Sequence, residues 1–156
     1  MGSVAGGAFV GAMHMAVFQK GDFWKNTGNN FHSFFRVGAA FLAGSAIVAS
    51  AFGGGVAGAG GNGLQGYVVS NNAIGGVQGG LTIGPSTLFA DRGSVAAVGV
   101  HEFGHTIQFI GLAGAAGLAG RGPGDVWGAY LGLGVLGLTP AGAWWENMAT
   151  GLGAMF

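Results

Sequence analysis

Glycine stands at 37 of the 156 positions of this chain, and no other feature constrains its fold as strongly. Each glycine brings backbone freedom that a regular helix or strand must remove. Half of the residues are hydrophobic, so the chain can bury a core. A chain with this composition is either locally flexible or packed with one backbone directly against another.

Charge is as scarce as glycine is abundant. Charged residues make up 6% of the chain, where a typical protein has about 25%, and the net charge is zero. Such a chain cannot form a patch that neutralises phosphates, so we expect no nucleic-acid partner. Cysteine is absent, which excludes a disulfide framework and a thiolate metal site.

The length fits one domain or a fragment of a longer protein. The opening residues, "MGSVAGGAFVGAMHM", show no basic segment followed by a clean apolar run, so they do not predict a signal peptide. They resemble the interior of a longer chain. We therefore expect the remainder of a larger polypeptide to be a partner of this segment.

The first half of the chain predicts one helix and a few short strands. Residues 19–36 read as a polar connection broken by Gly21, Gly28 and an Asn pair. An apolar helix is expected after residue 37, ending at the glycine run 53–55. Short strands are expected at about 65–69, 73–78 and 80–83, with Pro85 ending the last.

The second half predicts three helices. The strongest begins with Ser94 as its N-cap and ends at Gly111, and apolar side chains on every face are typical of a buried helix. A second helix is expected over 125–137. A third is expected from Thr139 and Pro140 through "AGAWWENMATGL", because a capping residue followed by proline favours a helix start.

The first of these three helices carries "HEFGH" at residues 101–105. His101 and His105 share one face, about 5–6 Å apart at Cβ, so both imidazoles can bind one Zn²⁺ at about 2.0–2.1 Å. Glu102 lies about 100° around the helix, where it can hold a metal-bound water and take its proton. With this composition the pattern arises by chance about once in 800 such chains. The alternative is two core histidines with Glu102 pointing outward.

A zinc enzyme needs a third protein ligand and one open position. Glu146 is the other glutamate of the chain, on a predicted helix with 40 residues between it and His105. Its alternative role is an ordinary surface glutamate in a first helical turn, where the helix dipole favours it. Poorer candidates lie in glycine-flanked or polar connections: Asp91, Asp125, His14 and His32.

"HEFGH" followed by "WENMA" resembles the gluzincin branch of zinc metallopeptidases. In that branch a glutamate on a later helix, in an E-x-x-A or E-x-x-x-D setting, is the third ligand. The resemblance implies that His101, His105 and Glu146 bind Zn²⁺ and that Glu102 is the general base or acid. It also implies that "GGLTIGP" forms an edge strand that aligns substrate.

The expected fold is therefore α+β and mainly helical. The buried HExxH helix packs on a second ligand-bearing helix, and a small antiparallel sheet or hairpin precedes it. Residues 1–63 form a glycine-rich, apolar and helical N-terminal region. Residues 64–156 form a zincin-like metallopeptidase core that acts on a peptide or protein substrate.

A second resemblance covers more of the chain. "GGLTIG", "STLFAD" and "HEFGHTIQ", with "GDFWKN" upstream, are similar to stretches in the glycine-rich C-terminal regions of RHS-repeat-associated bacterial proteins. This resemblance implies a toxin-like C-terminal domain of a large exported protein.

Several other residues have two interpretations. Gln108 could hydrogen-bond a ligand histidine or act as a cap near the helix end. Tyr130 or Tyr67 could stabilise an oxyanion, although each is more often a core residue. Core or interface packing is expected for the tryptophans Trp127, Trp144 and Trp145.

Two hypotheses compete with a zinc hydrolase. "WGAYLGLGVLGLTPAGAWW" and the run after residue 37 approach the length of about 20 apolar residues that spans a bilayer, which allows a membrane-inserted domain. However, Pro140 interrupts one run and no Lys/Arg bias flanks them. The other hypothesis is a scaffold with a structural ion, closed by a fourth ligand such as His14 or His32.

Overall fold

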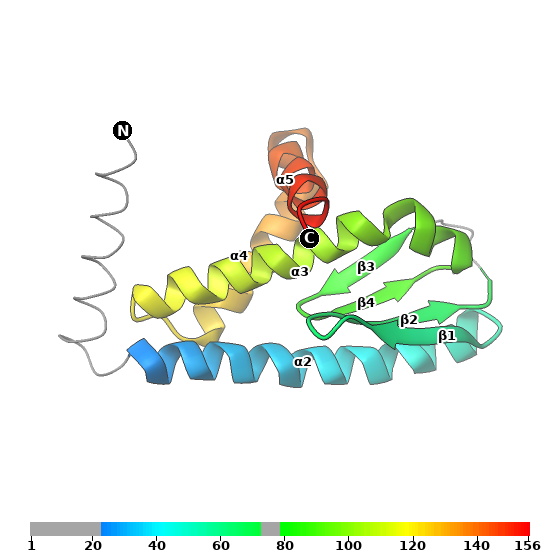
Figure 1. Ribbon diagram of the computed structural model, residues 1–156, viewed down its shortest axis with the longest axis horizontal. Helices are drawn as coiled ribbons and strands as arrows, with labels where there is room; N and C mark the ends of the chain where they lie inside the picture. Colours follow the sequence, from blue (N-terminus) through cyan, green and yellow to red (C-terminus); the bar gives the residue numbers. More distant parts are fainter. Residues whose placement is uncertain (1–22, 73–78) are drawn as a thin grey trace.

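The computed structural model describes residues 23–72 and 79–156 (Figure 1). The elements in chain order are α2 (Phe23–Phe52), β1 (Val56–Gly61), β2 (Gly66–Ser70), β3 (Gly80–Ile83), β4 (Ser86–Phe89), α3 (Arg92–Leu118), α4 (Pro123–Gly137), the 3₁₀ turn η2 (Pro140–Gly142) and α5 (Ala143–Gly153). The expected mainly helical α+β fold is confirmed.

The predicted break before residue 37 is wrong, because α2 runs without interruption through Gly28 and the Asn pair. Asn30 is buried, and its Nδ2 donates to the carbonyls of Ala113 (3.2 Å) and Arg121 (3.3 Å). These tertiary hydrogen bonds give the side chain partners that it would otherwise find in a turn. The predicted end of the helix before residues 53–55 is confirmed, and Gly21 lies outside the described residues.

The four strands form one sheet in the order β1-β2-β4-β3. β1 and β3 pair antiparallel with their neighbours, whereas β2 and β4 are parallel. The sheet is therefore mixed and not purely antiparallel, and β3 is an edge strand. Of the expected strands, 65–69 and 80–83 match β2 and β3, and 73–78 lies outside the described residues.

The strand at 80–83 ends before Pro85, as predicted, and Gly84 and Pro85 then form the turn into β4, a strand that the sequence did not predict. Gly84 has a φ of +61°, a conformation that a glycine adopts without strain. The hairpin places β4 beside β2. The parallel pairing joins β2 and β4, which are separated in the chain by β3. The pattern of residues within each strand therefore did not reveal it.

The HExxH helix, α3, begins earlier and ends later than predicted. Its N-cap is Asp91, which accepts the backbone N–H of Ser94 at 2.7 Å, so Ser94 lies in the first turn instead. The helix also continues through Gly111 to Leu118. The left-handed residue that follows it is Gly120, with a φ of +71°.

An apolar cluster at the meeting point of four helices holds α3 in place. Its buried members are Phe34 from α2, Phe109 and Ala113 from α3, Val126 and Tyr130 from α4, and Trp145 from α5. The rings of Phe34 and Phe109 stack with centroids 4.9 Å apart. Each of these aromatic side chains removes a large apolar area from water, so the cluster fixes the positions of α4 and α5 relative to α3.

Helices α3 and α5 cross, with the end of α5 beside α3 in Figure 1, and their backbones are in direct contact at the crossing. A Cβ at Gly104 would overlap the carbonyl oxygen of Ala149, and a Cβ at Gly153 would overlap that of Val100. Ala149 itself is fully buried. This crossing needs small residues on both helices, and here the glycines pack backbone against backbone.

Replacing Gly104 with Ala is expected to lower the free energy of unfolding by about 1–3 kcal/mol, because the new methyl group forces α5 away from α3. Gly111→Ala is the matched control, since Gly111 lies in the same helix with open space around it. There alanine should stabilise the helix by up to about 1 kcal/mol. Urea unfolding of both variants measures the difference. Equal stabilisation by both substitutions would contradict the close crossing.

Among the described residues, α2 is the one unbroken helix long and apolar enough to cross a membrane. Only 22% of its most apolar window is buried. The α4 and α5 segments reach a comparable length together, but they bend by 120° at their junction. A core helix of a soluble protein can have the same length and composition, so membrane insertion stays a prediction.

Candidate metal centre

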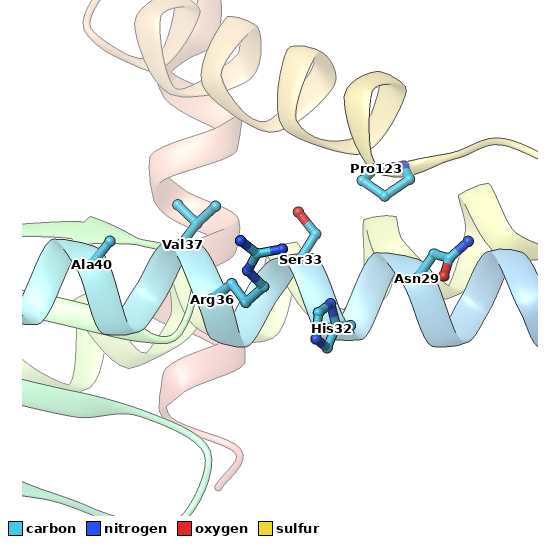
Figure 2. A pocket seen from close by; sticks show the side chains of 7 residues that line it. All are labelled: Asn29, His32, Ser33, Arg36, Val37, Ala40 and Pro123. Carbon is cyan, nitrogen blue, oxygen red and sulfur yellow. The ribbon is translucent and has the colours of Figure 1, made fainter.

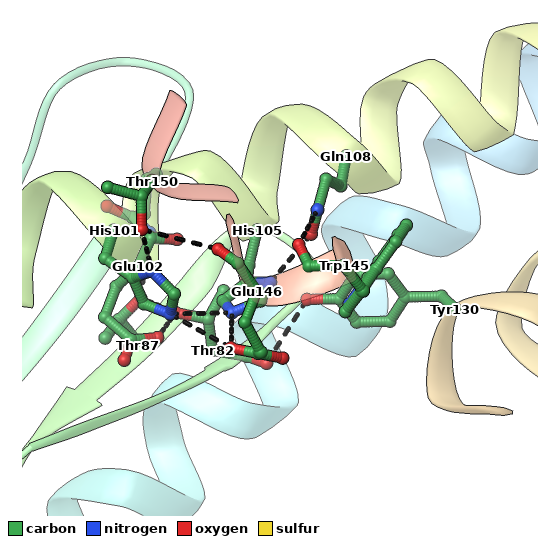
Figure 3. Close-up of polar contacts among 11 residues, drawn as sticks. Thr82, Thr87, His101, Glu102, His105, Gln108, Tyr130, Trp145, Glu146 and Thr150 are labelled. Carbon is green, nitrogen blue, oxygen red and sulfur yellow. Dashed lines mark hydrogen bonds and ion pairs between the residues drawn. The ribbon is translucent and has the colours of Figure 1, made fainter. Parts of the chain in front are cut away.

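The crossing of α3 and α5 brings together the three residues that the sequence singled out as metal ligands (Figure 3). His101 and His105 project from one face of α3, and Glu146 projects from the first turn of α5. Glu146 Oε2 lies 3.2 Å from His101 Nε2 and 3.3 Å from His105 Nε2. The two Nε2 atoms are 3.2 Å apart. The three atoms form a nearly equilateral triangle.

This triangle has the size of one face of a zinc tetrahedron. Bonds of about 2.0–2.1 Å at tetrahedral angles put neighbouring ligand atoms about 3.3–3.4 Å apart. Within residues 23–72 and 79–156, this is the one group of three or more such side chains with ligand atoms close enough to share an ion. The donor set, two imidazoles and a carboxylate, is one that zinc accepts readily.

The hydrogen bonds of His105 identify which ring nitrogen carries its proton. Gln108 is buried, and its Nε2 donates to the carbonyl of Trp145 at 2.7 Å. A carbonyl can only accept, so the amide oxygen Oε1 faces His105 Nδ1 at 2.7 Å. Nδ1 therefore donates, and in the neutral ring Nε2 presents its lone pair to the centre. Of the two roles considered for Gln108, a hydrogen bond to a histidine or a cap near the helix end, the structure shows the hydrogen bond.

The same reasoning applies to His101. Its Nδ1 lies 2.9 Å from Thr150 Oγ1, and this hydroxyl donates to the backbone carbonyl of Glu146 at 3.4 Å. Thr150 therefore accepts from Nδ1–H, and His101 Nε2 also presents a lone pair. With both Nε2 atoms unprotonated, two lone pairs and a carboxylate oxygen converge on one point, an arrangement that a bound cation would stabilise.

Glu102 points inward. The alternative of two core histidines required this side chain to point outward. Its side chain is buried, with the residue 6% exposed. Oε2 accepts a hydrogen bond from Thr82 Oγ1 at 2.7 Å. The carboxyl group packs so closely on β3 that a Cβ at Gly80 would come within 2.8 Å of it. Glu102 thus lies between the imidazole pair and the edge strand.

A cleft of about 300 Å³ opens over these side chains. One wall is the edge strand β3, and the other is formed by α4 and the start of α5. Apart from Glu102, Glu146 and the two histidines, the walls are uncharged. The apolar side chains that line the cleft are Leu81, Ile83, Leu131, Val135, Leu138 and Trp145.

Tyr130 also lines this cleft. Its hydroxyl donates to the carbonyl of Thr82 at 3.3 Å. Burial raises the pKa of Tyr130 above its ordinary value, and the negative charge of Glu102 raises it further, so the phenol stays a protonated donor. Tyr67, the other tyrosine considered for an oxyanion role, lies on β2 against Phe89 and does not line the cleft.

Of the other ligand candidates, those that the structure describes lie away from the centre. Asp91 caps α3, Asp125 lies in the first turn of α4, and His14 lies outside the described residues. His32 and Arg36 border a separate open hollow of about 540 Å³ between α2 and Pro123 (Figure 2). That hollow is larger than the cleft but contains no cluster of metal-binding side chains.

The sequence interpretation missed three polar residues beneath Glu102: Gln65, Thr82 and Thr87. They are buried and hydrogen-bonded to one another or to Glu102. No motif marks them, because they come from β3, β4 and the segment before β2. The three tryptophans considered for packing differ, since Trp145 is buried, Trp127 is partly buried in the core and Trp144 is half exposed.

No protein-family model matches this chain, and no curated protein or solved structure is significantly similar to it.

Proposed function

We propose that this chain is a zinc-dependent peptidase in which His101, His105 and Glu146 hold the metal and Glu102 is the general base. The observation that carries the proposal is the triangle of three electron-rich atoms, 3.2–3.3 Å on each side. A cation accounts for this arrangement, and the spacing suits zinc. The resemblance to gluzincins supports the same chemistry, and the resemblance to RHS-associated regions implies a toxin-like domain of a larger protein; both stay predictions.

A zinc ion bound there supplies a Lewis acid and lowers the pKa of its bound water. Glu102 would accept a proton from the attacking water as the water oxygen bonds to the carbonyl carbon of the scissile peptide. The C–N bond then breaks, and Glu102 passes the proton to the leaving amine. The Tyr130 hydroxyl is a protonated donor that lines the cleft, and it would stabilise the oxygen on which negative charge develops by exchanging its hydrogen bond to the Thr82 carbonyl for one to the substrate.

The shape of the cleft favours an extended peptide. Among the described residues β3 is an edge strand, and apart from the Thr82 carbonyl, which accepts from Tyr130, its outer row of backbone groups faces no other strand and could pair with a substrate strand. The apolar walls favour an apolar substrate side chain, since a charged one would lose its hydration without gaining a partner. Fluorogenic peptides with leucine or phenylalanine beside the scissile bond are the appropriate probes.

Removing the metal is expected to abolish hydrolysis. The purified chain should contain one zinc per molecule by elemental analysis and should cleave an apolar fluorogenic peptide. Dialysis against a chelator should remove both the zinc and the activity, and one equivalent of zinc should restore them. Activity that survives complete removal of the metal would overturn the proposal, as would a chain that binds no zinc.

A structural zinc site is the second candidate. Structural sites are closed by four protein ligands. Among the described residues, no fourth histidine, aspartate or glutamate joins the group of three. Of the fourth ligands considered, His32 lies on the separate hollow of α2, and His14 is outside the described residues. Within the described residues the group therefore offers three protein ligands, the number that a catalytic zinc site uses.

A further inference from the structure

A row of buried polar side chains lies directly beneath Glu102. Gln65 Nε2 is 2.8 Å from Thr87 Oγ1, and Thr87 Oγ1 is 2.6 Å from Thr82 Oγ1. Thr82 Oγ1 in turn is 2.7 Å from Glu102 Oε2. Figure 3 shows Thr82 and Thr87 on the strand side of Glu102. The row therefore connects the interior of the sheet to the carboxylate on α3.

The hydrogen bonds in this row can run in only one direction while Glu102 is a carboxylate. A carboxylate accepts and cannot donate, so Thr82 gives its one hydroxyl proton to Oε2. Thr82 must then accept from Thr87, which uses the one proton of Thr87. Thr87 is left to accept from the amide of Gln65. Each hydroxyl has its donor and acceptor capacity assigned.

Gln65 anchors the row to two other elements. Its Nε2 also lies 3.0 Å from Thr106 Oγ1 and 3.1 Å from the backbone carbonyl of Glu102. Thr106 donates to the carbonyl of Gly84, in the turn between β3 and β4, at 2.9 Å. Gln65 therefore links the sheet, the β3–β4 hairpin and the turn of α3 that carries Glu102 and Thr106.

We propose that Thr82 and Thr87 are positioning residues that orient the Glu102 carboxylate for its reaction with water, an inference that rests on the proposed function. The chain of hydroxyls holds Oε2 on the strand side. Among the described residues, Oε1 has no hydrogen-bond partner, so it is the oxygen left to take the proton. Thr82 also accepts from Tyr130 through its carbonyl, so β3 positions both the base and the tyrosine.

This arrangement has a specific kinetic consequence. A displacement of about 1 Å in a reacting group can lower a rate by about 100-fold without affecting binding. Loss of the Thr82 hydroxyl leaves Oε2 without its partner and allows the carboxylate to rotate. The change should therefore lower kcat while KM and the zinc content stay the same, because the hydrogen bonds of Thr82 Oγ1 go to Glu102 and Thr87 and not to the three proposed ligands.

Isosteric variants test the proposal. Thr82→Val and Thr87→Val remove one hydroxyl each, and both should lower kcat by about 10- to 100-fold. Thr82→Ser and Thr87→Ser keep the hydroxyl and should retain most of the activity. Thr106→Val is the matched control, because Thr106 is equally buried and also accepts from Gln65, but does not contact the carboxylate. It should keep the kcat of the parent.

A second measurement does not depend on activity. In crystal structures of the metal-free protein, the Glu102 carboxylate should leave its position against Gly80 in Thr82→Val and keep it in Thr82→Ser. An unchanged kcat and an unmoved carboxylate in Thr82→Val would overturn the positioning role, and so would an equal loss of kcat in Thr106→Val. If the parent hydrolyses no peptide, the proposed function fails, and the carboxylate position still decides whether the threonines orient Glu102.

Discussion

Glu102→Gln is expected to abolish peptide hydrolysis while the protein keeps its zinc. The neutral amide cannot take a proton from water, and loss of a general base lowers kcat by about 10²- to 10⁴-fold. The fold should survive, because the amide oxygen has the same shape and can accept the same hydrogen bond from Thr82. The three ligand side chains are untouched.

Two measurements separate this effect from a structural one. Elemental analysis should find one zinc per chain in both the parent and Glu102→Gln, and thermal unfolding should give similar midpoints. Steady-state kinetics with an apolar peptide should then show the loss in kcat with little change in KM. Hydrolysis by the variant at the rate of the parent would remove Glu102 from the mechanism.

The local part of the candidate site could be predicted from the sequence. His101, Glu102 and His105 lie within one turn and a half of a helix, so their relative positions follow from helix geometry alone. Gln108 follows His105 by three residues, which puts the two on one face, and they are hydrogen-bonded. Spacing within one helix is the most direct information that a sequence carries.

Glu146 could be predicted only as a candidate, because its approach depends on how two helices cross. Gly104 and Ala149 allow α3 and α5 to touch through their backbones, and this contact brings the carboxylate to the imidazoles. The small residues were visible in the sequence. Which small residue would meet which was not, in a chain with 37 glycines.

The features that the sequence did not predict share one physical cause, because each depends on contacts between segments that are distant in the chain. Asn30 was expected to break α2, but its partners are carbonyls more than 80 residues away. Most of β1 is glycine and alanine, "VAGAGG", which gives no alternating pattern that would predict a strand. This segment is a strand because it pairs with β2. Gln65 and Thr87 were not singled out, because their contacts with Glu102 and Thr82 form only when the sheet packs on α3.

Glu146→Ala is expected to cost more zinc affinity than any other change in α5. Two imidazoles remain, and the cation loses its one anionic ligand. The loss should exceed the roughly 10- to 100-fold that removal of a ligand's hydrogen-bond partner causes. Isothermal titration of the metal-free protein with zinc measures it directly. Asn147→Ala is the control, because Asn147 is the next residue of α5 and is exposed.

Thermal unfolding with and without zinc distinguishes a ligand from an ordinary surface glutamate. A ligand that binds the folded state alone stabilises it by about 4 kcal/mol at 1,000 times its Kd, so zinc should raise the Tm of the parent and of Asn147→Ala, but hardly that of Glu146→Ala. A glutamate that only complements the α5 dipole would contribute about 0.3–1 kcal/mol with or without zinc. If zinc raises the Tm of Glu146→Ala as much as that of the parent, Glu146 is not the third ligand. The interaction of its charge with the α5 dipole would then be its role.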